Sequence, residues 1–365
     1  MRFVVAKRQG RRGGGLGNEI LPWAKGWIAS QVLDAHLVGP SWGMNKRRYD
    51  RNFGTSRLDF LLEDALLRLP HYEFTQADYQ ATCEIDFRTA LEKWASVRGL
   101  TKNGSYIVSV EGMWGGYPSI REARSFLLAK LLNSRDALRN SYQIASRLDH
   151  RKLFVAVHMR LAKDGFLSPQ PGENVRGKFN IFVPIDWYLW VCESLKTAFG
   201  EDIEFRFFTD RRGPEFDEAV RRFNPGQIVQ QGLTECSDLL LMSRADLRVC
   251  SVSSYSLAAC FLSEGPFLWY EPQLTLSHGL YSLWGQSETR HPTPGLTPAT
   301  SRNGNHRVET RANGIDHSRA YLGSGMKIDD RLPESLVQML RQRLILRDSK
   351  TNLLEYGSVP QVYTH

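Results

Sequence analysis

Short apolar runs alternate with segments of helical periodicity through the second half of the chain. The apolar runs predict strands over residues 153–158, 203–208, 246–250 and 266–270, with a further short strand near 227–230. The periodic segments predict helices over residues 185–198, 214–223, 237–244 and 255–263, and a last helix at about 333–346. Strands separated by helices are typical of a parallel, doubly wound sheet, so the pattern indicates an α/β fold.

The first half begins with the same pattern and then loses it. Residues 3–6 predict a buried strand, and a glycine-rich loop leads from it to an amphipathic helix with apolar residues at spacings of three and four. Asn18 is the expected N-cap of this helix, and Pro22 is expected in its first turn. Residues 40–75 show no clear period. Helices are predicted over residues 85–98 and 119–148.

The length of 365 residues exceeds the size at which one hydrophobic core usually stops growing, which favours two domains. A charged break at residues 149–152 separates the two halves, so we expect an N-terminal domain over 1–150 and a C-terminal domain over 151–365. Residues 285–318 are rich in Thr, Pro, Gly, Asn and Arg and show neither period. This composition predicts a flexible insert in the second domain.

The net charge of +8 suits nucleic acid, an anionic membrane surface or an anionic small substrate. No nucleic-acid recognition signature accompanies the charge, so we expect no nucleic-acid partner, whereas peripheral membrane contact stays open. The five cysteines lack metal-ligand spacing, which indicates free thiols in a reducing compartment and no metal site. Without a signal peptide or a long apolar run, the chain is expected to be cytoplasmic.

Polar residues stand where three of the predicted strands end. His158 and Arg160 end the first run of the second half, Asp210 follows the next, and a hydroxyl-rich segment over 251–256 follows the third. In an open α/β sheet, ligands bind just past the carboxyl ends of the strands. A fixed cation, a carboxylate and a group of hydroxyls at this edge suit a ligand that carries phosphate.

Glycines dominate the loop from Gly10 to Asn18 between the first strand and the first helix. The loop lacks the third glycine of G-x-G-x-x-G, since Asn18 stands at that position, and no G-K-[ST] follows. Backbone amides that open a helix face anionic groups favourably. The loop is therefore open to two interpretations, a structural turn or a phosphate-facing segment.

Four segments in order resemble motifs of the GT-B fucosyltransferase superfamily, whose α-1,2-, α-1,6- and protein O-fucosyltransferases use GDP-fucose. Residues 14–19, G-G-L-G-N-E, resemble the G-G-x-G-N-Q of the α-1,2 enzymes, and residues 157–160, V-H-M-R, resemble the shared H-x-R-R. Residues 208–210, F-T-D, are similar to T-D-D or S-D, and residues 238–256 to the last motif block of the α-1,6 branch. The resemblance implies two Rossmann-like domains that face each other across a cleft, with the acceptor on the N-terminal side.

The resemblance also implies inverting, metal-independent transfer of fucose, or a related 6-deoxyhexose, from a GDP-sugar to an acceptor hydroxyl. Arg160 would hold the β-phosphate and stabilise it as it leaves, His158 and Asp238 would contact guanine, and the hydroxyl-bearing residues would bind phosphate. The whole predicted donor-binding set is Gly15, Gly17, Asn18, His158, Arg160, Asp210, Asp238, Ser253, Ser254, Tyr255 and Ser256. Candidates for a catalytic carboxylate are, in order, Glu19, Asp164 and Glu173.

Three positions depart from the motifs. Leu161 stands at the second arginine of H-x-R-R, Arg211 at the second acid of T-D-D, and Glu19 at the usual glutamine. The sugar and the linkage therefore stay open, and the acceptor is a glycan, a lipid-linked precursor or a small molecule. The alternatives are a glycosyltransferase of the same fold with another nucleotide sugar and a non-catalytic protein that binds anions or nucleic acid. No cofactor besides the donor substrate is expected.

Overall fold

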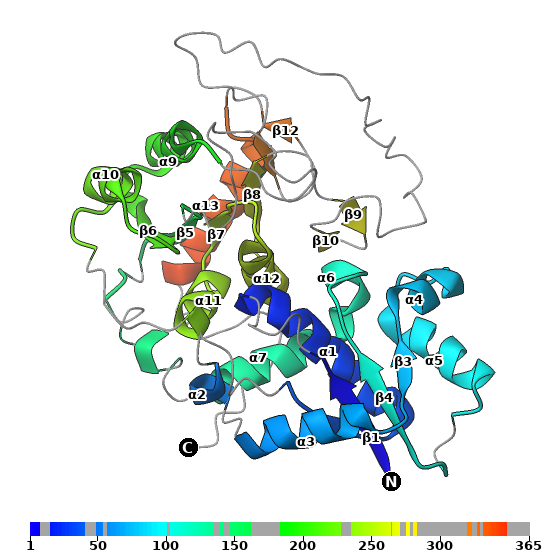
Figure 1. Cartoon of the computed structure of the whole chain (residues 1–365). Helices are drawn as coiled ribbons and strands as arrows, with labels where there is room; N and C mark the ends of the chain where they lie inside the picture. The colour runs from blue at the N-terminus through cyan, green and yellow to red at the C-terminus, as the bar shows by residue number, and fades with distance from the viewer. Residues whose placement is uncertain are drawn as a thin grey trace, which may run out of the picture.

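A parallel sheet and a mostly parallel one, each with helices packed on it, form the two lobes of the molecule (Figure 1). The structure is a computed structural model. It describes residues 1–7, 15–40, 49–53, 57–100, 103–134, 137, 139–141, 143, 147–149, 151–161, 183–227, 235–263, 265–270, 275–277, 280–282, 320–322, 327–328 and 331–348. None of the helices in these ranges has both the length and the apolarity needed to cross a bilayer.

The first sheet has four parallel strands in the order β2-β1-β4-β3. These are β1 (Arg2–Ala6), β2 (His36–Val38), β3 (Tyr72–Phe74) and β4 (Tyr106–Val110). Helix α1 (Leu16–Leu33) packs against β1 and β4, and α3 (Arg57–Arg68) packs against β1 and β2, where Leu66 joins a small cluster with Val5 and Val38. Because helices cover the sheet, its central strands β1 and β4 are mostly apolar, with Arg2 and Ser109 as exceptions.

The remaining helices of this lobe are short. They are α2 (Asp50–Phe53), α4 (Gln76–Thr82), α5 (Phe87–Val97), α6 (Gly116–Ser119), the 3-10 turn η1 (Arg121–Ala123) and α7 (Arg124–Leu132). The helical region predicted over 119–148 is confirmed in part: the chain leaves the helical conformation at Asn133 and Ser134, and the described residues between 137 and 143 are helical again. The Ser134 hydroxyl instead accepts a bond from the amide of Ala137, 3.4 Å away, as a residue that competes with helical hydrogen bonding does.

The start of α1 also differs from the prediction. Gly15, and not Asn18, is the N-cap, because the amides of Asn18 and Glu19 already bond to the Gly15 carbonyl at 2.9 and 3.2 Å. Pro22 consequently lies inside the helix and not in its first turn. The Asn18 side chain is thereby released from capping and points to a partner in the other lobe.

The second sheet has the order β12-β11-β8-β7-β5-β6, with four parallel strands extended by two antiparallel ones. Its strands are β5 (Leu153–Met159), β6 (Ile203–Thr209), β7 (Leu247–Val249), β8 (Phe267–Tyr270), β11 (Ala320–Leu322) and β12 (Lys327–Ile328). Its helices are α9 (Ile185–Phe199), α10 (Pro214–Phe223), α11 (Glu235–Ser243), α12 (Ser254–Leu262) and α13 (Glu334–Asp348), with the 3-10 turn η2 (Gly200–Asp202) after α9. A separate hairpin pairs β9 (Thr275–Ser277) with β10 (Leu280–Ser282). The parallel α/β fold predicted for this half is confirmed.

Two segments predicted from the sequence lie outside the described residues. They are most of the short strand near 227–230 and the insert over 285–318. The two antiparallel strands β11 and β12 were not predicted.

The two lobes meet through the first turns of α1 and α12, which lie side by side (Figure 1). A Cβ atom added to Gly17 in α1 would lie 2.5 Å from the backbone carbon of Ser254 and from the nitrogen of Tyr255. The Tyr117 hydroxyl donates to the carbonyls of Gly17 and Ser254, at 3.2 and 3.1 Å. Because α1 follows the carboxyl end of β1 and α12 follows that of β7, this contact brings the carboxyl edges of the two sheets together.

Candidate functional site

The parallel part of the second sheet has a switch point between β5 and β7. From β5 the chain moves to β6 on one side, and from β7 it moves to β8 on the other. Ligands of open α/β sheets bind outside the carboxyl ends of the strands at such a point. His158 and Arg160 lie at the end of β5, and Ser251 follows β7, so the structure brings these predicted site residues to one place.

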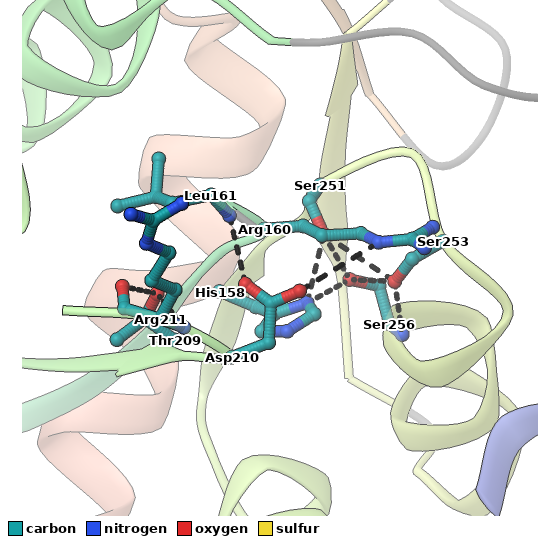
Figure 2. A network of polar contacts seen from close by, with 9 residues as sticks. All are labelled: His158, Arg160, Leu161, Thr209, Asp210, Arg211, Ser251, Ser253 and Ser256. Atoms are coloured by element: carbon teal, nitrogen blue, oxygen red, sulfur yellow. Dashed lines mark hydrogen bonds and ion pairs between the residues drawn. The ribbon is translucent and has the colours of Figure 1, made fainter. Parts of the chain in front are cut away.

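His158 ties the end of β5 to the loop and helix that follow β7 (Figure 2). Its Nδ1 atom lies 2.7 Å from the hydroxyl of Ser256 and 2.8 Å from that of Ser251. Burial of the ring lowers the pKa of His158 to about 4; the carboxylate of Asp210 opposes the shift and the charge of Arg160 adds to it. The ring is therefore neutral at physiological pH and joins the two elements through neutral hydrogen bonds.

The serines also shape the start of α12. The Ser253 hydroxyl caps this helix by accepting a bond from the amide of Ser256 at 3.1 Å. It lies 3.3 Å from the hydroxyl of Ser251 in the same network. A capped helix N-terminus carries a partial positive charge and backbone N–H groups, and both favour a bound phosphate.

Arg160 provides the fixed positive charge beside this helix, and its side chain points toward the loop with Ser251 and Ser253 (Figure 2). Its Nε atom lies 3.8 Å from a carboxylate oxygen of Asp210. The other oxygen of Asp210 accepts a bond from the backbone amide of Leu161, at 2.8 Å. Both side chains are about a third exposed, at 31% and 33%, so a ligand can reach the guanidinium that Asp210 orients.

Asp238 lies on α11, one turn after Glu235 and close to Arg206 of β6. Desolvation of its carboxyl group raises the pKa of Asp238 to about 7; the charge of Arg206 opposes this rise and that of Glu235 adds to it. The Tyr49 hydroxyl donates to the Glu235 carboxylate, and the Tyr255 hydroxyl donates to the Glu235 carbonyl. A residue of the first lobe thus holds the acidic start of α11.

The predicted residues of the first lobe lie where α1 meets α12. The Asn18 amide oxygen accepts a bond from the Ser254 hydroxyl, and Gly17 packs its backbone on that of Ser254 and Tyr255. At Gly15 an added Cβ would meet nothing within 4 Å. Glu19 is fully buried. The other two carboxylate candidates, Asp164 and Glu173, lie outside the described residues.

Sequence reasoning missed two residues that join the lobes, Tyr49 and Tyr117. Tyr117 follows β4, which was not predicted although residues 106–110 read Y-I-V-S-V, an apolar run that favours a strand. Nothing local distinguishes Tyr49, because its partner Glu235 is 186 positions away. Within the described ranges, no three His, Cys, Asp or Glu side chains form a group that could hold a metal ion.

No protein-family model matches the sequence, and no curated protein matches it. Among solved structures, the chain is similar to the fucosyltransferase NodZ from Bradyrhizobium, with 14% identity over 74% of this chain and 95% of that one and a TM-score of 0.45. POFUT1 in complex with GDP-fucose has 13% identity over 72% of this chain and 94% of that one, with a TM-score of 0.44. A mutant of Arabidopsis thaliana FUT1 in complex with GDP has 11% identity over 77% of this chain and 73% of that one, with a TM-score of 0.41. At these identities the likeness concerns the fold alone.

Proposed function

We propose that this chain is a glycosyltransferase that moves fucose from GDP-fucose to an acceptor hydroxyl, with inversion and without a metal ion. One observation carries the proposal: Arg160 and the capped start of α12 lie together at the switch point of the second sheet, facing the carboxyl edge of the first. A diphosphate can bind to Arg160 and the start of α12, and a second substrate can bind on the facing edge of the first sheet. The order of the four sequence motifs supports the guanosine and fucose parts of the donor.

In this proposal the residues of the second lobe bind the nucleotide. The planar guanidinium of Arg160 pairs with oxygens of the β-phosphate, and the amides at the start of α12 face the other phosphate oxygens. Asp238 accepts hydrogen bonds from the guanine edge. His158 is neutral and holds β5 and α12 in register, so that these groups are positioned before the donor arrives.

The same residues promote the reaction. The acceptor oxygen attacks the anomeric carbon from the face opposite GDP, and the bond from that carbon to the phosphate oxygen breaks. Negative charge then grows on the β-phosphate, where Arg160 stabilises it. The N-terminal lobe, which presents Asn18 beside Ser254, holds the acceptor side.

A donor panel tests the proposal. Purified protein is incubated with GDP-fucose, GDP-mannose, UDP-glucose and dTDP-rhamnose, and release of the nucleoside diphosphate is measured. We expect GDP release from GDP-fucose. Turnover with UDP- or dTDP-sugars alone would assign another donor, and salt-dependent binding of generic DNA without any GDP binding would assign a nucleic-acid-binding protein.

GDP binding is expected to strengthen as the pH rises from 6 to 8. The pKa of Asp238 is about 7, so its carboxyl is mostly protonated at pH 6 and is mostly the ionised acceptor that guanine donors require at pH 8. If only the ionised form binds, affinity rises about tenfold over these two pH units, following the fraction ionised. Calorimetry with GDP at pH 6, 7 and 8 measures this rise. Asp238→Asn should bind more weakly at pH 8 and lose the dependence; the same slope in both proteins would contradict the assignment.

Activity is expected to survive removal of divalent cations. Arg160 supplies at the β-phosphate the positive charge that a bound cation provides in metal-assisted transfer. GDP release from GDP-fucose should therefore keep its rate after dialysis against EDTA. Loss of activity that manganese or magnesium restores would reveal a metal clamp.

A further inference from the structure

The first sheet has a switch point of its own, between β1 and β4. From β1 the chain moves to β2 on one side, whereas β4 pairs with β1 on the other side and is followed outward by β3. Ligands of open α/β sheets bind beyond the carboxyl ends of the strands at a switch point, which is the reason for placing the donor between β5 and β7. By the same reasoning, a second ligand is expected at the carboxyl ends of β1 and β4. Glu111 is the first residue after β4, and its side chain is exposed there.

The backbone after Glu111 is held firmly. Gly112 adopts a φ of +76°, which favours glycine, and an added Cβ would lie 2.7 Å from the ring of Trp114. The ammonium of Lys25, a fully buried residue of α1, donates to the Gly112 carbonyl at 3.1 Å and lies 3.3 Å from the centre of the Trp114 ring. Glu111 therefore stands on a preorganised turn, as a reacting group requires.

The same segment reaches the nucleotide-binding lobe within a few residues. Tyr117, six positions after Glu111, donates to the carbonyl of Ser254 at the start of α12. Segment 111–117 thus runs from the switch point of the first sheet to the helix on which the diphosphate is proposed to sit. An acceptor bound over this segment would lie between the two lobes, beside the sugar.

The other described carboxylates near this junction are engaged elsewhere. Glu19 is fully buried, and Asp210 orients Arg160 and the Leu161 amide. The Glu235 carboxylate accepts from Tyr49. Within the described ranges, Glu111 is an exposed carboxylate at the carboxyl edge of the first sheet, which faces the donor site.

We propose that Glu111 is the general base of the transfer, an inference that rests on the proposed function. The Glu111 carboxylate accepts the proton of the acceptor hydroxyl as its oxygen forms the bond to the anomeric carbon. The bond from that carbon to the β-phosphate oxygen breaks at the same time, and GDP leaves with the electron pair. Proton transfer of this kind contributes about 10²–10⁴-fold to the rate.

The test uses GDP-fucose alone, with water as the acceptor that Glu111 activates, and measures GDP release from the full chain. Glu111→Gln is expected to lower kcat at least about 100-fold while the Kd for GDP stays within twofold of wild type. The acid limb of the kcat–pH profile should disappear in this variant, and Glu111→Asp should keep part of the activity. Glu92→Gln, at an exposed carboxylate on α5, is the matched control and should behave like wild type.

The outcomes separate the two proposals. GDP release by Glu111→Gln at a third or more of the wild-type rate, or an unchanged acid limb, would overturn the role of Glu111 and leave the proposed function intact. Absence of GDP binding and of GDP release in the wild-type protein would overturn the proposed function, and the inference with it. A parallel loss of GDP affinity in Glu111→Gln would show a structural role and also overturn the inference.

Discussion

Replacing Arg160 by alanine is expected to lower the turnover of GDP-fucose by about 10²–10³-fold, the usual cost of removing one group that stabilises developing charge. The guanidinium is oriented by Asp210 and lies beside the capped start of α12, where the β-phosphate is proposed to leave. Because this interaction strengthens as negative charge grows on the phosphate, the loss should fall mainly on kcat. Steady-state GDP release and calorimetry with GDP measure the two effects separately.

Arg160→Lys is the sharper variant. Lysine keeps the positive charge but loses the planar pair of N–H donors, so its activity should stay close to that of the alanine variant. Arg211→Ala serves as the control, since Arg211 is an exposed arginine one residue beyond Asp210 and bonds to Thr209 only through its backbone. Near-wild-type turnover by the lysine variant would be incompatible with bidentate phosphate binding.

The second sheet could be predicted because its strands carry their own signal. β5 is buried over all seven residues, and a strand buried on both faces reads as an apolar run in the sequence. In the first sheet, β2 and β3 have three residues each and carry exposed side chains, so no such run marks them. Their places are set by pairing with β1 and β4, which a local pattern does not record.

The site residues also divide into those with a local signal in the sequence and those placed by distant parts of the chain. His158 and Arg160 are predicted because both are polar residues at the end of an apolar run. The surroundings of Asn18 and Gly17 depend on α12, which lies more than 230 positions further along the chain. The contact between Gly17 and the backbone of Ser254 is therefore not visible in the sequence, whereas the cap predicted at Asn18 is wrong for a local reason, because the helix already begins after Gly15.

Gly17→Ala is expected to destabilise the junction of the lobes. The added methyl group would lie 2.5 Å from backbone atoms of Ser254 and Tyr255, which cannot move away as the end of a flexible side chain can. Overpacking of this kind costs about 1–3 kcal/mol and occasionally more. The change in helix propensity acts in the opposite direction, because alanine is favoured over glycine inside a helix by up to about 1 kcal/mol. A net loss of stability would therefore report the contact itself.

Gly15→Ala is the matched control, two residues earlier in the same glycine-rich segment. An added Cβ at Gly15 meets nothing within 4 Å, and its φ of −66° suits any residue. Thermal unfolding should therefore show a clear fall in Tm for Gly17→Ala and only a small one for Gly15→Ala, where alanine is a weaker N-cap than glycine but disturbs no contact. Because α12 carries the proposed phosphate-binding amides, displacement of its first turn should also weaken GDP binding in Gly17→Ala. Equal Tm values and equal GDP affinities for the two variants would show that the lobes do not meet through this glycine.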